Sequence, residues 1–222
     1  SGSYLLLASL DISRRNLALR GEESFAKVMD MAEYARREIN EIGGYYAYGK
    51  ELVNGTSVYD YDVTKLSVHT LGLGLAGIEV YDLLRDEYDI QIEFGDVSNI
   101  LAYISIGDRL QDIERLVGAL ADIARIYKKD STGMLSGEFI SPIVARSPQE
   151  AFYSAKESMP VEKTEGRISG EFVMCYPPGI PILAPGEMIT DEIIQYILYV
   201  KEKGCSMQGT EDKSVNKLKV LV

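Results

Sequence analysis

Apolar residues in the first forty positions recur three or four places apart, which is the spacing of one helix face. The set is Phe25, Val28, Met29, Ala32, Ala35, Ile39 and Ile42. Gly21 separates this helix from an earlier one predicted over residues 4–19, and Gly43-Gly44 ends it. Arg36 and Arg37 stand near its end, where positive charge favours the negative end of the helix dipole. The opening of the chain therefore predicts two helices.

The period changes after a polar loop around Asn54-Gly55. Apolar and polar residues alternate over residues 65–70, which is the pattern of a half-buried strand. The elements expected next are a helix over 75–88, strands over 89–94 and 100–106, and a long helix up to residue 128. The unit is therefore β-α-β-β-α, and a small α/β sandwich is the natural way to bury its apolar faces.

The last third of the chain predicts a further α+β unit. Ser147-Pro148-Gln149-Glu150 forms a capping box with proline at the first helical position. Thr190 caps another helix. Strands are expected over residues 168–175 and 218–222. The polar stretch 128–137, which contains Gly133 and Gly137, is the best boundary before this unit.

A proline-rich tract over residues 176–187 is the least generic part of the sequence. Four of the seven prolines fall within it. Proline fixes φ and removes a backbone donor, so this tract cannot be a central strand of a sheet. We expect a rigid extended path with turns at Gly179 and Gly186. Such a path can wall a pocket or an interface, although composition alone favours a structural connector.

Composition narrows the classes of partner. The 222 residues include 34 acidic and 23 basic side chains, a net charge of −11, which disfavours a nucleic-acid partner. No stretch of about 18 uninterrupted apolar residues is present, so no membrane span is expected. Cys175 and Cys205 are too few for a disulfide scaffold, suit a reducing cytoplasm and are expected to be buried thiols. The chain opens at Ser1-Gly2-Ser3 without Met, so we expect a piece of a longer protein; a cloning scar at Ser1-Gly2 is the other explanation.

Three features could carry chemistry. Gly72-Leu73-Gly74-Leu75-Ala76-Gly77 fits the G-x-G-x-x-G dinucleotide fingerprint, but a doubly wound sheet needs more βαβ crossovers, and small residues also let a helix pack tightly on a sheet. His69 is the only histidine and is more typical of a packed or surface residue. No His/Cys/Asp cluster has metal-ligand spacing, so no metal is expected. Glu93 ends a predicted strand beside Asp96 and Asn99, where a carboxylate is either solvated or paired with a cation.

Several segments resemble one family in the same order along the chain. The first set is Glu165-Gly166-Arg167-Ile168-Ser169, Glu171-Phe172-Val173 and residues 176–187. It is similar to the C-terminal signature of the bacterial ornithine/lysine/arginine decarboxylases, which are pyridoxal-phosphate enzymes of the aspartate-aminotransferase fold. Ser3-Tyr4-Leu5-Leu6-Leu7-Ala8-Ser9-Leu10-Asp11 resembles the segment after the family's cofactor lysine. Residues 71–77 resemble its helix start, and residues 90–93 and 105–108 resemble its small-domain strands.

This resemblance implies three regions. Residues 1–60 would be the end of the pyridoxal-phosphate large domain with a linking helix, 61–130 a small α/β domain, and 131–222 the decarboxylase C-terminal domain. The family's Schiff-base lysine lies in an upstream Ser-x-His-Lys stretch, whereas here Thr70 follows the only histidine. Decarboxylation needs an imine and a protonated pyridine ring. No catalytic residue and no activity are therefore expected in this chain alone.

The resemblance also implies binding roles. It places Ser1 and Ser3 near the cofactor phosphate of a partner subunit, because hydroxyls and a helix N-terminus suit an anion. Gly2 stands where the family commonly has Pro. Glu93 would reach the distal cationic end of a basic amino acid, and Tyr176 belongs to the loop that would help to close the pocket.

The sequence therefore favours the C-terminal part of a decarboxylase that uses pyridoxal 5'-phosphate. Arginine, converted to agmatine and CO2, is favoured over lysine or ornithine. The expected partners are a second copy or the missing N-terminal part, and apolar faces left uncovered predict self-association. Two alternatives stay open: a non-catalytic regulatory or oligomerisation module, and a dinucleotide-binding domain at residues 72–77.

Overall fold

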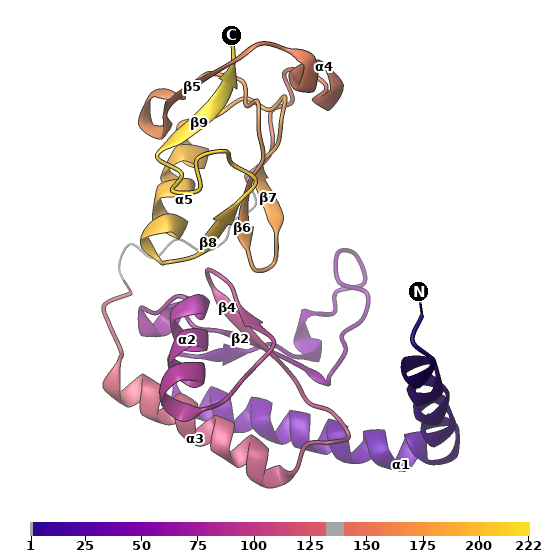
Figure 1. Cartoon of the computed structure of the whole chain (residues 1–222). Helices are drawn as coiled ribbons and strands as arrows, with labels where there is room; N and C mark the ends of the chain where they lie inside the picture. Colours follow the sequence, from indigo (N-terminus) through magenta and orange to yellow (C-terminus); the bar gives the residue numbers. More distant parts are fainter. Residues whose placement is uncertain (1, 132–139) are drawn as a thin grey trace.

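A computed structural model describes residues 2–131 and 140–222, and Ser1, Gly133 and Gly137 lie outside that part. The described residues form helices and three small sheets (Figure 1), which confirms the mixed α/β class. The division into regions at residues 60 and 130 stays a prediction. No helix in the described part is long and apolar enough to cross a membrane.

The first helix, α1 (Tyr4–Ile42), is continuous through Gly21, so the prediction of two separate helices was wrong. One glycine costs a helix only about 1 kcal/mol relative to alanine, which the residues on both sides can outweigh. Figure 1 shows the ribbon changing direction between its indigo and violet parts. Its buried side chains all lie in the second part, from Val28 to Ile39. Gly43, with φ of +81°, ends the helix as predicted.

A four-stranded antiparallel sheet lies on α1. Its order is β1 (Tyr46–Ala47), β2 (Lys65–His69), β4 (Asn99–Tyr103) and β3 (Phe94–Gly95). Two short 3-10 turns, η1 (Lys50–Leu52) and η2 (Leu71–Leu73), precede α2 (Gly77–Tyr88), and α3 (Leu110–Ile126) follows β4. The predicted β-α-β-β-α order is confirmed.

The strand predicted over residues 89–94 is mostly absent. Asp89 adopts a left-handed conformation, with φ of 52°, and the Ile90 amide donates to the carbonyl of Leu84. These contacts close the end of α2, so the chain reaches the sheet only at β3. Ile92 is nevertheless buried, as its apolar character predicts.

One apolar core lies between the sheet and the helices. Its fully buried large side chains are Ile39, Leu66, Leu73, Leu75, Leu84, Ile100, Leu120 and Ile123. In Figure 1, α1 and α3 run side by side beneath the sheet. Burying one such side chain contributes roughly 1.5–3 kcal/mol, so this core holds the unit together.

The C-terminal part carries two further sheets. Its elements are α4 (Pro148–Tyr153), β5 (Lys156–Pro160), η3 (Val161–Lys163), β6 (Val173–Tyr176), β7 (Ile180–Leu183), α5 (Asp191–Glu202), β8 (Ser206–Gln208) and β9 (Lys217–Leu221). β5 pairs with β9, and the other sheet has the order β7-β6-β8. From Pro177 onward, the proline-rich tract thus contributes only the edge strand β7, as the missing donor of Pro181 requires.

Helix caps in this part follow the sequence. The Glu150 amide donates to Ser147 Oγ at 3.2 Å, and the Ser147 amide donates back to the Glu150 carboxylate, so the predicted capping box is confirmed. Thr190 Oγ1 accepts from the Ile193 amide at 3.3 Å. The strand predicted over residues 168–175 is shorter, because Ile168 and Ser169 form only isolated bridges before β6.

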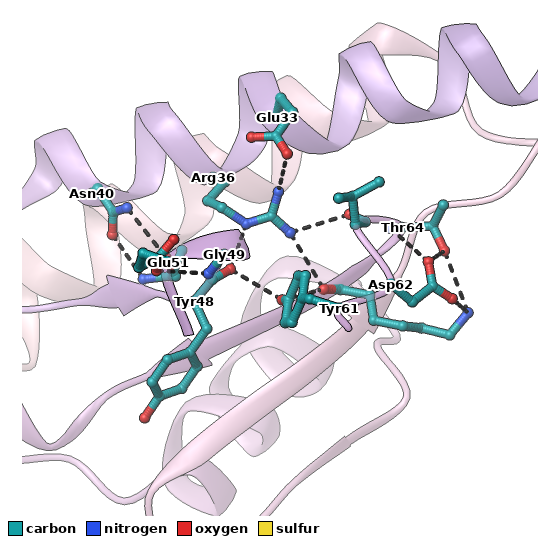
Figure 2. Close-up of polar contacts among 12 residues, drawn as sticks. Glu33, Arg36, Asn40, Tyr48, Gly49, Glu51, Tyr61, Asp62 and Thr64 are labelled. Atoms are coloured by element: carbon teal, nitrogen blue, oxygen red, sulfur yellow. Dashed lines mark hydrogen bonds and ion pairs between the residues drawn. The ribbon is translucent and has the colours of Figure 1, made fainter. Parts of the chain in front are cut away.

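Arg36 is buried and clamps α1 onto the loop before β2 (Figure 2). Its Nη2 donates to the carbonyl of Val63 at 3.1 Å, its Nε donates to the carbonyl of Tyr48, and its Nη1 lies 3.1 Å from Glu33. The Tyr61 hydroxyl donates to the same Tyr48 carbonyl at 3.0 Å. The helix-dipole interpretation of Arg36 and Arg37 was wrong, because α1 extends to Ile42 and no basic residue lies in its last turn. The Arg36 guanidinium instead binds backbone carbonyls of a neighbouring segment.

Candidate functional site

A cavity of about 490 Å³ opens between the small sheet and the C-terminal part. This volume lies within the range of small-molecule sites. Its lining combines aromatic, proline and polar side chains from both sides. The residues are Tyr48, His69, Asp96, Val97, Ser98, Asn99, Ile140, Cys175, Pro177, Pro178, Ile180, Pro181, Ile182 and Tyr196.

The polar wall is built on the turn between β3 and β4. Asp96 Oδ1 accepts from the amides of Ser98, at 2.8 Å, and Asn99, at 2.7 Å. This turn aims the Asn99 amide group at two aromatic residues. Its Oδ1 accepts from the Tyr48 hydroxyl at 3.3 Å and lies 3.3 Å from His69 Nδ1. The Arg36 clamp holds the Tyr48 backbone, so the core also positions this wall.

The opposite wall comes from β6, β7 and α5. Cys175 is buried on β6, and Tyr196 is half-buried on α5. The prolines at 177, 178 and 181 give this wall a rigid backbone, because their φ angles are fixed. The proline-rich tract therefore lines a cavity, which is the alternative that composition alone did not favour over a structural connector.

Asp96 is the only acidic side chain in the described lining, which includes no lysine or arginine. Burial raises the pKa of the Tyr196 hydroxyl to about 12, and the charges of Cys175 and Asp96 add to this effect. Burial, together with Asp96, also raises the pKa of Tyr48. One carboxylate among neutral aromatic rings suits a cationic ligand such as an ammonium or guanidinium group.

Tyr196→Phe is expected to make stability less sensitive to alkaline pH. The folded-state pKa of about 12 lies above the unfolded value of about 10, so the folded protein holds its proton longer. The stabilisation is complete below pH 10 and is lost as the pH rises toward 12. Urea unfolding at intervals across this window should show a shallower decline for the variant. Equal slopes would contradict the assignment.

The residues predicted to bind ligands are not gathered in this cavity. Ser3 is exposed at the start of α1, and its side chain makes no capping hydrogen bond. Glu93 is exposed, and Tyr176 is exposed beside the lining residue Pro177. Their proposed partners belong to other chains or ligands, so these roles stay predictions. His69, which the sequence treated as a packed or surface residue, is half-buried and lines the cavity.

The sequence drew attention to Asp96 and Asn99 only as neighbours of Glu93. No sequence motif marked Tyr48 or Tyr196 as a site residue, because the two come from segments far apart in the chain. Their only hint was the high tyrosine content, 15 residues. The cavity depends on tertiary contacts that periodicity does not predict.

A covalent pyridoxal-phosphate site does not fit the described residues of this cavity. No lysine lines it. Thr70 occupies the position after His69, and it is fully buried, with its hydroxyl donating to the Leu75 carbonyl at 2.8 Å. The Thr70 hydroxyl is therefore used in a hydrogen bond that holds the backbone between β2 and α2.

Comparison with known proteins shows which protein family the C-terminal residues resemble. Residues 136–213 match the family model described as "Orn/Lys/Arg decarboxylase, C-terminal domain". Residues 136–213 of the chain are thus similar to the C-terminal domain of the Orn/Lys/Arg decarboxylases, and the whole chain aligns with the C-terminal portion of the arginine decarboxylases that it resembles.

Particular relatives are similar over the whole chain. The arginine decarboxylase of Bacillus subtilis is 40% identical over 224 residues, covering 100% of this chain and 46% of the relative. That of Halalkalibacterium halodurans is 40% identical over 227 residues, with the same coverage. The chain thus spans less than half the length of these proteins. The Escherichia coli constitutive lysine decarboxylase structure superposes with a TM-score of 0.69 at 18% identity, covering 100% of this chain and 44% of that one, which shows a shared fold.

Proposed function

We propose that this chain is the C-terminal part of a pyridoxal 5'-phosphate-dependent decarboxylase of basic amino acids, acting in the cytoplasm. Arginine is the proposed substrate, with CO2 and agmatine as products. The observation that carries the proposal is the 40% identity to two bacterial arginine decarboxylases across the full length of the chain. The cofactor, when bound in the whole enzyme, supplies the electron sink for loss of the carboxylate.

The role proposed for this chain is to bind the cationic end of the substrate. Two carboxylates are candidates. Glu93 is proposed from the family resemblance and is exposed, whereas Asp96 is supported by its place in the cavity wall with Tyr48. Tyr176, exposed at the end of β6, is proposed to close over the substrate with the proline-rich tract.

Activity assays of the whole enzyme encoded by the gene test this proposal. CO2 release should be greatest with arginine, compared at equal concentrations with lysine and ornithine. Glu93→Gln and Asp96→Asn should be measured separately, because both keep size while removing charge. The residue that binds the cation is the one whose variant raises KM for arginine. An enzyme that releases no CO2 from any of the three amino acids would overturn the proposal.

The chain by itself is expected to hold no covalent cofactor. Pyridoxal phosphate added to the 222-residue chain, followed by borohydride, should label surface lysines weakly and at several positions, because the described cavity lining has no lysine. Peptide mass mapping measures the distribution of the label. Stoichiometric labelling of one lysine would contradict this expectation.

The first part of α1 is proposed to contact another polypeptide. Its large apolar side chains are exposed: Tyr4, Leu5, Leu6, Leu7, Leu10, Ile12, Leu17 and Leu19. An apolar stretch of this kind favours an interface. We propose that a second copy or the remainder of the enzyme covers it, and that Ser1 and Ser3 then approach the cofactor phosphate of a partner subunit.

A further inference from the structure

The two cysteines are far apart in the sequence but meet in the fold. Cys175 lies on β6, opposite Met207 of β8, and Cys205 lies two residues before Met207. Residues in this diagonal relation across an antiparallel pair share one face of the sheet. The two thiols are in hydrogen-bonding contact and lie in one apolar cluster with Val97 and Val200. No disulfide joins them.

Each thiol also borders an opening. Cys175 lines the cavity of about 490 Å³, and Cys205 lines a second hollow of about 560 Å³. The second hollow is bounded mainly by β8 and the loop that follows it. A small reagent can therefore reach the pair although both side chains are less than one-tenth exposed.

The local charges favour unequal reactivity. The hydrogen bond from Cys205 lowers the pKa of Cys175, whereas this same bond and burial raise the pKa of Cys205. Asp96, the nearby carboxylate of the small sheet, opposes ionisation of both thiols. These directions favour Cys175, which lines the cavity of about 490 Å³, as the attacking thiol of the pair, since the thiolate form attacks disulfides.

We propose that Cys175 and Cys205 form a thiol–disulfide exchange site for low-molecular-weight organic disulfides. The Cys175 thiolate attacks one sulfur of the reagent, whose S–S bond breaks and releases one small thiol. Cys205 then loses its proton and attacks Cys175 in the mixed disulfide, which releases the second small thiol. The two protein thiols are oxidised to one intramolecular disulfide, the reagent is reduced, and both protons end on the released thiols.

The form with the Cys175–Cys205 disulfide would have a differently shaped cavity, and no cofactor is needed for this change. The bond would join β6 to the turn at Gly204, whose positive φ of 79° marks a tight bend before β8. Cys175 would then be drawn toward β8 and away from the wall that it shares with the prolines. The site is independent of the proposed decarboxylase function, because its chemistry uses only these two side chains.

Intact-mass measurement of the folded 222-residue chain with hydroxyethyl disulfide tests the proposal. After alkylation of remaining thiols, the wild type should have lost two hydrogen atoms and carry no alkyl group, and dithiothreitol should restore two alkylatable thiols. Cys205→Ala should stop at one mixed adduct on Cys175, with Cys175→Ala as the matched comparison. Circular dichroism confirms that each variant is folded.

Three results would overturn the proposal. The wild type could accumulate mixed adducts without the internal bond, or form disulfide-linked dimers, or react only after denaturation. The wild-type measurement decides between these outcomes even if an alanine variant fails to fold.

Discussion

Gly77→Ala is expected to lower the free energy of unfolding by about 3 kcal/mol, because the added methyl group has no space. A Cβ at this position would overlap the carbonyl group of Asn99 and lie 2.8 Å from its amide nitrogen. Both obstacles are backbone of β4, and the Ile78 amide is tied to the Asp96 carbonyl at 2.7 Å. The start of α2 therefore cannot move away cheaply. Urea unfolding should show a lower midpoint with an unchanged slope.

Gly118→Ala is the matched control. Gly118 is exposed in the middle of α3, and a Cβ there meets nothing within 4 Å. The same chemical change should therefore stabilise the protein by roughly 0.5–1 kcal/mol, since alanine is the better helix former. Opposite signs at the two positions are the expected result. A Gly77 variant as stable as the wild type would show that the close approach to β4 is not required.

Close contacts between backbone segments explain the glycine motif at residues 72–77. A Cβ at Gly72 would lie 3.3 Å from the carbonyl carbon of Gly44, and one at Gly74, with φ of +71°, would lie 2.8 Å from the Asp130 carbonyl oxygen. Each glycine of the G-x-G-x-x-G segment thus faces backbone of this chain. The strands described around it pair antiparallel. The packing interpretation accounts for the motif without a bound dinucleotide.

Arg36→Ala is expected to cost about 3 kcal/mol or more of unfolding free energy. The change would leave the carbonyls of Tyr48 and Val63 without this donor in a buried setting, which carries a desolvation penalty. Arg36→Lys should recover little, because an ammonium group cannot span the same set of acceptors as the planar guanidinium. Denaturant unfolding of both variants measures the effect.

The neighbouring arginine provides the control for this experiment. Arg37 is exposed and pairs with Glu38 at 3.2 Å on the helix surface. Arg37→Ala should change stability by less than about 0.5 kcal/mol. Equal effects at the two positions would mean that Arg36 acts through helix propensity or net charge, which both variants change alike.

The sequence predicted elements where a local rule applies. The capping box at Ser147, the cap at Thr190 and the β-α-β-β-α order depend on residues close together in the chain, and all three are confirmed. The prediction of a helix end at Gly21 was wrong, because the helix-forming residues on both sides outweigh one glycine. The short strands β5 and β8 were not predicted, because they form by pairing with distant segments. The cavity was missed for the same reason, since Tyr48 and Tyr196 meet only after folding.

Sheet edges are a hazard because their unpaired backbone groups can recruit a strand from another molecule. β7 is such an edge: it is only four residues long and contains Pro181. Each proline removes one donor that an incoming strand would need, and a short strand gives it few others. The rigid tract that walls the cavity therefore also protects this sheet against edge-to-edge aggregation, so replacing its prolines to loosen the wall would expose a surface prone to polymerisation.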